Sequence, residues 1–184
     1  MVLVKKTKKL IFFVMLILLP SFVISISSFD LSDYPKPFVF DSVSLNTLII
    51  VGENAKAEDM IGAVEIANSL GLNISSELIV LDTQIKSVKE NNAIVVGGPC
   101  VNMAAAELMG FPVNCDDGFY PGKAKIKLFQ GLSGQKNNTA LLVAGYSAMD
   151  TKLACGVLSR YKEYKLEGKD IETSGSILND IILI

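Results

Sequence analysis

Three times along the chain the same order recurs: a short apolar segment, a glycine and a longer stretch with helical spacing of its apolar residues. The apolar segments with their glycines are residues 48–52, 93–97 and 141–145. The stretches with helical spacing are residues 55–70, 100–109 and 148–161. Short apolar runs that alternate with amphipathic helices are typical of parallel strands covered by helices on both faces. The repeated unit therefore predicts an α/β fold.

Further strands are predicted between these units. Residues 78–81 are apolar throughout, which predicts a central parallel strand. Residues 123–130 alternate between lysine and mainly apolar side chains, and a Gly- and Asn-rich turn joins them to residues 141–145, which predicts an antiparallel hairpin. Residues 170–173 form a weaker strand pattern. We expect a three-layer, Rossmann-like, mostly parallel sheet with the antiparallel hairpin at its edge.

The N-terminal segment differs in kind from the rest of the chain. A cluster of four lysines between positions 5 and 9 precedes residues 10–29, which contain no ionisable side chain. An apolar run of this length can cross a bilayer as a helix, with its basic flank on the cytoplasmic side. The pattern predicts export, with signal cleavage between Ser27 and Ser28 or retention of residues 1–27 as a membrane anchor. A buried core helix is less favoured, because the segment has no polar face.

The remainder is expected to consist of an entry segment and one domain. Residues 28–46 contain Pro35 and Pro37 and are expected to be extended, because the residue before a proline avoids the helical conformation. Residues 47–184 are long enough for a single α/β domain. Contact with a membrane is therefore expected only through residues 1–27.

The charge balance changes when the leader is set aside. Without its four lysines the chain has 13 basic and 19 acidic residues, a net charge near −6. An acidic surface of this kind argues against nucleic-acid binding, which requires basic patches that replace phosphate counterions. It suits a soluble surface protein.

The predicted export bears on the oxidation state of the three cysteines. Outside the cytoplasm a thiol pair can oxidise and persist, and Cys100 and Cys115 flank a short helical pattern, so they are predicted to form a disulfide. Cys155 lies within the helical spacing of residues 148–161 and is predicted to be a small, buried, reduced side chain. The alternative is that all three cysteines are reduced and buried.

The sequence lacks the residues on which most catalytic sites depend. It contains no histidine, so the commonest general base and metal ligand, and every Ser-His or Cys-His pair, are missing. The cysteines have no CxxC spacing, and neither a GxxxxGK[ST] loop nor a GxGxxG fingerprint occurs. We therefore predict no catalytic residues, no metal site, no cofactor and no enzymatic activity.

Polar or turn-forming residues follow each of the three repeated strands. They are Glu53 and Asn54, then Pro99 and Asn102, and finally Tyr146 and Ser147. The carboxyl ends of parallel strands share one edge of a sheet, where ligands bind in open α/β folds, so we expect these residues to gather there. In the favoured interpretation they form turns and helix caps, with Ser147 and Asp150 as a capping box, and alanine at Asn54, Asn102 or Ser147 costs about 0.5–2 kcal/mol. In the alternative they line a small-molecule site.

Two acceptor sequons for N-linked glycans are present, at Asn73 and Asn137. Both fall in predicted turns, where an exported protein can carry a glycan. Asn137 is the stronger candidate, because its surroundings are rich in Gly, Gln, Lys and Asn.

Four motifs stand out after the leader. They are DYPKPFV at 33–39, IVGEN at 50–54 followed by Asp59, GGPCVN at 97–102, and AGYSAMDT at 144–151. In order and spacing they resemble the α/β domain of archaeal surface-layer (S-layer) proteins of the methanogen and Thermococcus type, over residues 33–164.

The resemblance implies a non-enzymatic protein of the cell surface, with other envelope or S-layer proteins or further copies of itself as partners. It implies no catalytic residues. S-layer proteins of this type are usually much longer and carry additional β-rich regions, so an accessory role beside a lattice is one expectation and participation in the lattice is another. The alternative function is an exported domain that binds a small ligand or glycan at the carboxyl edge of the sheet.

Overall fold

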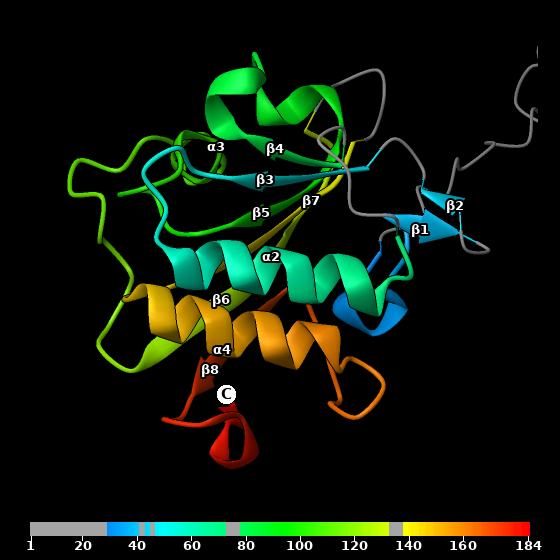
Figure 1. Cartoon of the computed structure of the whole chain (residues 1–184), viewed down its shortest axis with the longest axis vertical. Helices are drawn as coiled ribbons and strands as arrows, with labels where there is room; N and C mark the ends of the chain where they lie inside the picture. The colour runs from blue at the N-terminus through cyan, green and yellow to red at the C-terminus, as the bar shows by residue number, and fades with distance from the viewer. Residues whose placement is uncertain (1–28, 41–42, 45–46, 73–77, 133–137) are drawn as a thin grey trace, which may run out of the picture.

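The computed structural model describes residues 29–40, 43–44, 47–72, 78–132 and 138–184 (Figure 1). The leader with its predicted cleavage site, and the sequon residues Asn73 and Asn137, lie outside these ranges. None of the helices within the ranges is both long enough and apolar enough to cross a membrane.

The described residues form a mixed α/β fold. The strands are β1 (Val39–Phe40), β2 (Val43–Ser44), β3 (Thr47–Val51), β4 (Ile79–Leu81), β5 (Asn92–Val96), β6 (Lys123–Phe129), β7 (Ala140–Gly145), β8 (Asp170–Ser174) and β9 (Ile182–Leu183). The α-helices are α2 (Ala57–Ser69), α3 (Met103–Leu108) and α4 (Ala148–Ser159). Single turns of 3-10 helix lie at Leu31–Asp33, Asp82–Gln84, Val88–Glu90 and Leu178–Asp180. The three predicted strand and helix units correspond to β3 with α2, β5 with α3 and β7 with α4.

Seven strands form one sheet in the order β4-β3-β5-β7-β6-β8-β9, and β1 and β2 form a separate antiparallel pair. The pairings among β4, β3, β5 and β7 are parallel. The pairings of β6 with β7, of β6 with β8 and of β8 with β9 are antiparallel. The sheet is therefore mixed, with a parallel half and an antiparallel half.

Three expectations about the sheet need correction. The predicted hairpin of β6 and β7 is present, but it is not at the edge, because β8 pairs with the other side of β6. The strand at 79–81 is parallel as predicted but lies at the edge of the described sheet rather than in its centre. The sheet is also less parallel than expected, because the weak pattern near residue 170 is a full strand, β8, and β9 extends it.

The alternating pattern of β6 has a clear physical basis. Ala124, Ile126 and Leu128 are buried, whereas the intervening lysines are only partly covered. Two of those lysines form ion pairs with acidic residues of the neighbouring strand β8. Lys123 pairs with Glu172, and Lys127 pairs with Asp170, with Nζ 2.6 Å from Oδ2. Such cross-strand pairs help to set the register of an antiparallel ladder.

Helices cover both faces of the sheet. Figure 1 shows α2 and α4 side by side in front of the sheet, with their first turns on the left, and α3 on the far side. A larger apolar cluster, which includes Ile49, Ile94 and Val143, packs beneath α2 and α4. A second cluster, which includes Ile50 and Val95, packs beneath α3. Successive residues of β3 and β5 point to opposite clusters, which explains why these strands are apolar throughout.

The helices α2 and α4 approach each other closely at Gly62 and Cys155. A Cβ atom on Gly62 would lie 2.7 Å from the sulfur of Cys155, so only glycine fits at this crossing. Cys155 is completely buried and reduced, as predicted from its helical spacing.

The extended conformation expected for residues 28–46 is found in the short strands β1 and β2 but not in residues 31–38. Residues 31–38 form a turn of 3-10 helix followed by further turns, and the two peptide bonds before Pro35 and Pro37 are cis. Leu31, Tyr34 and Phe38 are buried in the larger core cluster. Burial of these three side chains favours the compact path, because an extended path would leave them in water.

Candidate functional site

The carboxyl ends of β3, β5 and β7 meet at one end of the domain, and the turns that follow them pack backbone against backbone. A Cβ atom on Gly52, just after β3, would lie 1.8 Å from the carbonyl oxygen of Val101 in the turn after β5. A Cβ atom on Gly145, at the end of β7, would lie 2.5 Å from the amide nitrogen of Thr151 in α4. Glycine at these two positions lets the turns close, which brings the first turns of α2 and α4 beside the loop after β5.

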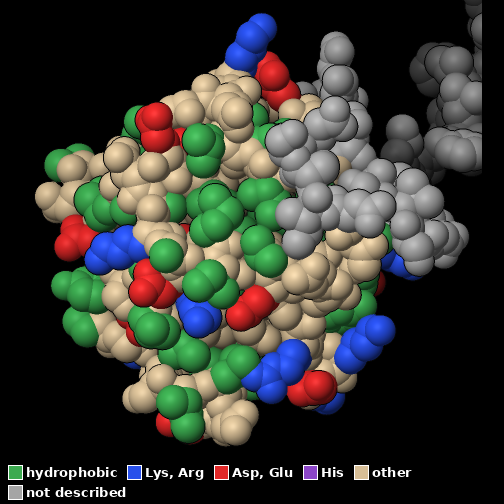
Figure 2. Space-filling view, in the orientation of Figure 1, with side chains coloured by type: hydrophobic (Ala, Val, Ile, Leu, Met, Phe, Trp, Pro, Cys, Tyr) green, Lys and Arg blue, Asp and Glu red, His purple; other side chains and the backbone are tan. Residues whose placement is uncertain are grey.

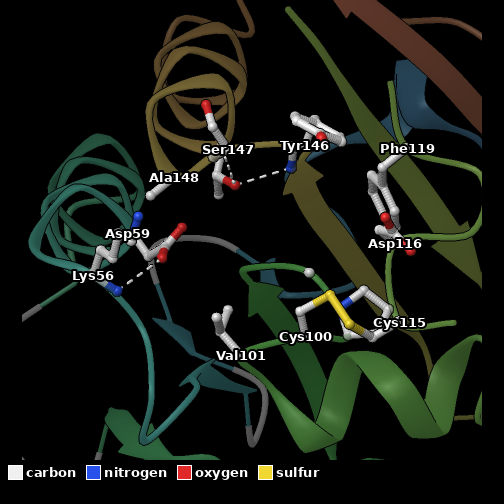
Figure 3. A pocket seen from close by; sticks show the side chains of 14 residues that line it. Lys56, Asp59, Cys100, Val101, Cys115, Asp116, Phe119, Tyr146, Ser147 and Ala148 are labelled. Carbon is white, nitrogen blue, oxygen red and sulfur yellow. Dashed lines mark hydrogen bonds between the residues drawn. A yellow bond between two sulfur atoms is a disulfide. The ribbon is translucent and has the colours of Figure 1, made fainter. Parts of the chain in front are cut away.

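A cleft of about 140 Å³ lies between these turns. Its walls come from the first turns of α2 and α4, the loop after β5 and the segment before β6 (Figure 3). The lining side chains that decide its chemistry are Lys56, Asp59, Asp116, Phe119 and Tyr146. Drug-sized ligands usually occupy pockets of roughly 300–1,000 Å³. This cleft therefore has room for a compact chemical group.

Asp59 is the buried acidic residue of the cleft, with only 1% of its surface exposed. Its Oδ2 atom accepts a hydrogen bond of 3.1 Å from the backbone amide of Lys56, which caps the first turn of α2. Its Oδ1 atom has no hydrogen-bond partner among the described residues. Figure 3 shows the carboxylate turned toward the open space of the cleft. A buried carboxylate oxygen without a donor is costly.

The surroundings of Asp59 disfavour its charged form. Burial raises the pKa of the Asp59 carboxyl above its ordinary value of 3.8, and the Lys56 amide and the nearby Thr151 hydroxyl oppose part of that shift. The Thr151 hydroxyl also donates to the Ser147 carbonyl at 3.2 Å and accepts from the Gly145 amide at 2.9 Å.

A disulfide forms part of the wall opposite Asp59. Cys100 and Cys115 are bonded, as the sequence predicted, with their Cα atoms 4.8 Å apart. The bond ties the loop after β5 to the segment that carries Asp116 and Phe119. Phe119 is buried in the cluster beneath α3, whereas Asp116 is exposed at the mouth of the cleft. The disulfide therefore anchors an acidic residue across from Asp59.

The six edge residues predicted from the sequence divide into three groups. Pro99, Tyr146 and Ser147 line the cleft. Asn102 is buried next to it, with 1% of its surface exposed. Glu53 and Asn54 are exposed and are not part of the lining. Sequence reasoning did not select the side chains of Lys56, Asp59, Asp116 and Phe119 for this site, although Asp59 belongs to one of the motifs of the resemblance.

The favoured capping interpretation holds for two residues and fails for a third. Ser147 and Asp150 form the predicted capping box at the start of α4. Asn102 caps α3 by accepting hydrogen bonds from the amides of Ala104 and Ala105. Asn54 caps no helix, because α2 begins three residues later and its first turn is closed by Asp59.

Replacement of Asn102 by alanine should lower the free energy of unfolding by about 2 kcal/mol, more than a lost cap alone. The Asn102 side chain also donates to the carbonyls of Ile50 and Val96, at 3.2 and 2.9 Å, and so joins β3, β5 and α3. Urea denaturation measures the effect, with Asn54→Ala as the matched control that should change stability by less than about 0.5 kcal/mol. Equal effects of the two substitutions would contradict this account of Asn102.

Replacement of Asp59 by asparagine should stabilise the protein at neutral pH, by roughly 1 kcal/mol, because it removes a buried charge while an oxygen remains to cap α2. The folded-state pKa of Asp59 is raised, so the wild type is favoured below the ordinary value of 3.8 and loses that advantage as the pH rises through the raised pKa. The difference between Asp59→Asn and wild type should therefore be small near pH 3 and grow toward pH 7. Denaturation curves of both proteins across this range check the trend, and a difference that shrinks with rising pH would refute it.

Large apolar side chains are exposed at several places on the domain, and one of them, Tyr146, lines the cleft. Among the described residues they are Met60, Ile61, Met103, Phe111, Val113, Tyr120, Tyr146, Met149, Ile177, Ile182 and Ile184. Figure 2 shows hydrophobic side chains along the left margin, the end at which α2 and α4 begin, and also over the centre of this face.

The sheet topology places four of these side chains at one end of the domain. Met103 opens α3 and Tyr146 directly follows β7, so both lie where the parallel strands end. Tyr120 precedes β6, which starts beside the end of β7. Ile177 follows β8, whose last residue pairs with the first residue of β6. We call this end of the domain, with these four side chains and with Val113, two residues before Cys115 of the disulfide, the apolar end.

Among the residues that the structure describes, no group of three or more Cys, Asp or Glu side chains is arranged to hold a metal ion. No protein-family model matches the chain, and no match to a curated protein was found.

Proposed function

We propose that this chain is a non-enzymatic protein of the cell surface that binds other envelope proteins through the apolar end of its α/β domain. The observation that carries the proposal is the concentration of exposed large apolar side chains at that end. Large exposed apolar patches are uncommon on soluble monomeric proteins and often mark surfaces that bind other proteins. Single exposed apolar residues scattered over the whole surface would not support such a role.

The relation to archaeal S-layer proteins is part of the same proposal. It is supported by the four motifs, three of which belong to the strand ends that form the cleft and the apolar end. In this proposal the parallel half of the sheet, with its helices on both faces, is a Rossmann-like unit to which β6, β8 and β9 are added. The partners are other envelope or S-layer proteins, and binding to a second copy of the chain is one measurable form of the same contact.

Location is the first test. The full chain, expressed with its leader, should be found in the envelope fraction or outside the cytoplasmic membrane, because a basic cluster followed by an uncharged run directs export. Intact-mass analysis should place the mature N-terminus at Ser28 if the leader is cleaved. A full-length chain that stays soluble in the cytoplasm would refute the proposal.

The apolar end is tested by changing its most exposed members. Met103 and Val113 are 63% and 97% exposed, so Met103→Ser with Val113→Ser should alter the surface without disturbing the core. The double variant should be released from the envelope fraction at salt concentrations that leave the wild type bound, because apolar contacts resist salt and are lost with these side chains. Lys165→Ser, in an exposed position beyond the last turn of α4, is the control and should stay bound. Retention of the double variant equal to that of the control would exclude this surface.

A second function, an exported domain that binds a small ligand, is favoured by one specific observation. The buried Asp59 carboxylate has an oxygen without a partner at the base of the cleft.

A further inference from the structure

Residues 112–118, which lie between α3 and β6, have few non-covalent contacts with the rest of the domain. Val113 and the five residues after it are exposed, and no side chain of the segment belongs to either apolar core cluster. Among the described residues, the segment forms hydrogen bonds only within itself and with Phe119. The Asp117 amide donates to the Asn114 carbonyl at 3.0 Å, and the Asn114 amide donates to Asp117 Oδ2 at 3.4 Å. These bonds fold the segment on itself but do not attach it to its neighbours.

The residues on either side of the segment are fixed to the domain. The Phe111 amide donates to the Ala106 carbonyl in α3 at 2.7 Å. Phe119 is buried in the cluster beneath α3. Between these two anchors, the bond from Cys115 to Cys100 ties the middle of the segment to the loop after β5. Loss of this bond would therefore leave both ends in place and release the middle.

The same segment closes one side of the cleft. Cys115 and Asp116 line the cleft from the segment, and Cys100 lines it from the loop after β5. Figure 3 shows the disulfide on the side of the cleft that also carries Asp116 and Phe119. Movement of the segment would remove Cys115 and Asp116 from this wall, whereas the parts of the wall that come from α2 and α4 would stay in place.

The disulfide can be reached by a thiol reagent in water. Both of its cysteines are exposed, and both line the cleft. Exchange begins when a thiolate reaches one of the two sulfur atoms, so access to them decides whether the folded protein can react. Cys155 is completely buried, so a small thiol reagent reaches the exposed pair and not this third cysteine.

We propose that residues 112–118 are a flap which the Cys100–Cys115 disulfide holds against the cleft, and that a dithiol which reduces this bond frees the flap while the domain stays folded. The cleft wall would then depend on the thiol redox state of the surroundings. The inference does not depend on the cell-surface role proposed above, since it concerns the cleft wall alone.

The exchange needs a dithiol and no other reactant. One thiolate of the dithiol attacks a sulfur of the disulfide, which forms a mixed disulfide and releases the other cysteine as a thiolate. The second thiol of the dithiol then attacks the dithiol's own sulfur in the mixed disulfide and releases the first cysteine. The dithiol ends as a cyclic disulfide, and the protein gains two electrons and two protons as the thiols of Cys100 and Cys115.

The test compares the backbone dynamics of the oxidised and reduced protein. The full chain, labelled with ¹⁵N and purified in a neutral detergent, is reduced with dithiothreitol at pH 8 and measured at pH 6.5 without oxygen. The order parameters of Val113, Asn114 and Asp117 should fall from about 0.85, the value of rigid backbone, to below about 0.6. The amide signals of β5 and α4 should keep their positions. Order parameters that stay near 0.85 after reduction would overturn the proposal, as would the loss of the β5 and α4 signals.

Alkylation tests whether the bond is accessible in the folded state. Iodoacetamide added after dithiothreitol, without urea, should modify Cys100 and Cys115 but not Cys155, as measured by peptide mass spectrometry. A bond that dithiothreitol reduces only at urea concentrations that unfold the domain would overturn the proposal.

Two variants separate the disulfide from other effects of the reductant. The double variant Cys100→Ser with Cys115→Ser should have a mobile flap without dithiothreitol and should not respond to it. Cys155→Ala is the matched control, because it retains the disulfide, and its flap should respond to dithiothreitol as that of the wild type does. A rigid flap in the double variant would show that the disulfide does not hold the flap, and would overturn the proposal while leaving the envelope-location experiment unaffected.

Discussion

Replacing Gly52 with alanine is expected to lower the free energy of unfolding by about 3 kcal/mol, in the upper range for inserting atoms into a closely packed site. The added Cβ atom would lie 1.8 Å from the carbonyl oxygen of Val101 and 2.6 Å from its carbonyl carbon. Both are backbone atoms, so no side chain can rotate away to make room. The turns after β3 and β5 would have to separate, which would also strain the Asn102 hydrogen bonds that join them.

Urea denaturation measures this loss, and Gly98→Ala is its matched control. Gly98 lies in the neighbouring turn, and a Cβ atom there would have only the Gly145 carbonyl oxygen nearby, at 3.7 Å, an ordinary contact. The control should change stability by less than about 0.5 kcal/mol. If Gly52→Ala is as stable as Gly98→Ala, the close approach of the two turns is not what holds this end of the domain together.

Removal of the Cys100–Cys115 disulfide is expected to cost about 3 kcal/mol in the chain-entropy model for a loop of 15 residues. The reason is that the bond restricts the unfolded chain, which gains conformational freedom once the ring is opened. The double variant Cys100→Ser with Cys115→Ser should therefore unfold at lower urea concentration than the wild type in the absence of reductant.

A reductant provides the internal control for this prediction. It should destabilise the wild type to the level of the double variant and leave the double variant itself unchanged, because the remaining Cys155 is a buried, unbonded thiol. An effect of reductant on the double variant would point to some other cause of the loss.

The elements of the fold were predictable, whereas their order in the sheet was not. Helical and strand periodicity record which side chains are buried, so β3, β5 and β7 and the helices after them could be read from apolar spacing. Which strands are neighbours depends on contacts between distant residues. The pattern at 79–81 fits a parallel strand equally well in the centre or at the edge, and nothing local indicates that β8 pairs with β6.

The site was predictable in its place but not in its chemistry. The sequence predicted that the residues after the glycine-ended strands gather at one edge of the sheet, and Pro99, Tyr146 and Ser147 do line the cleft there. Asp59 gave no such signal, because an acidic residue in the first turn of a helix is ordinarily a cap. One of its oxygens does cap α2, and only the packing of α4 and the loop after β5 buries the other.

The entry segment shows the limit of a local rule. The preference of residues before proline for non-helical conformations is satisfied at Tyr34, whose φ and ψ are −55° and 132°. The rule does not decide whether successive turns extend or fold back. Here the apolar side chains of Leu31 and Phe38 decide it, since both are buried against the domain.

The crossing of α2 and α4 at Gly62 and Cys155 gives the molecule an internal reporter of its motions. The thiol is fully enclosed, and burial raises its pKa well above the ordinary value, so a thiol reagent in water can react with it only after the two helices separate. The rate of its modification therefore counts opening events of this helix pair. Both helices begin at the cleft. A ligand that holds their first turns together should therefore lower the rate at which the Cys155 thiol is modified.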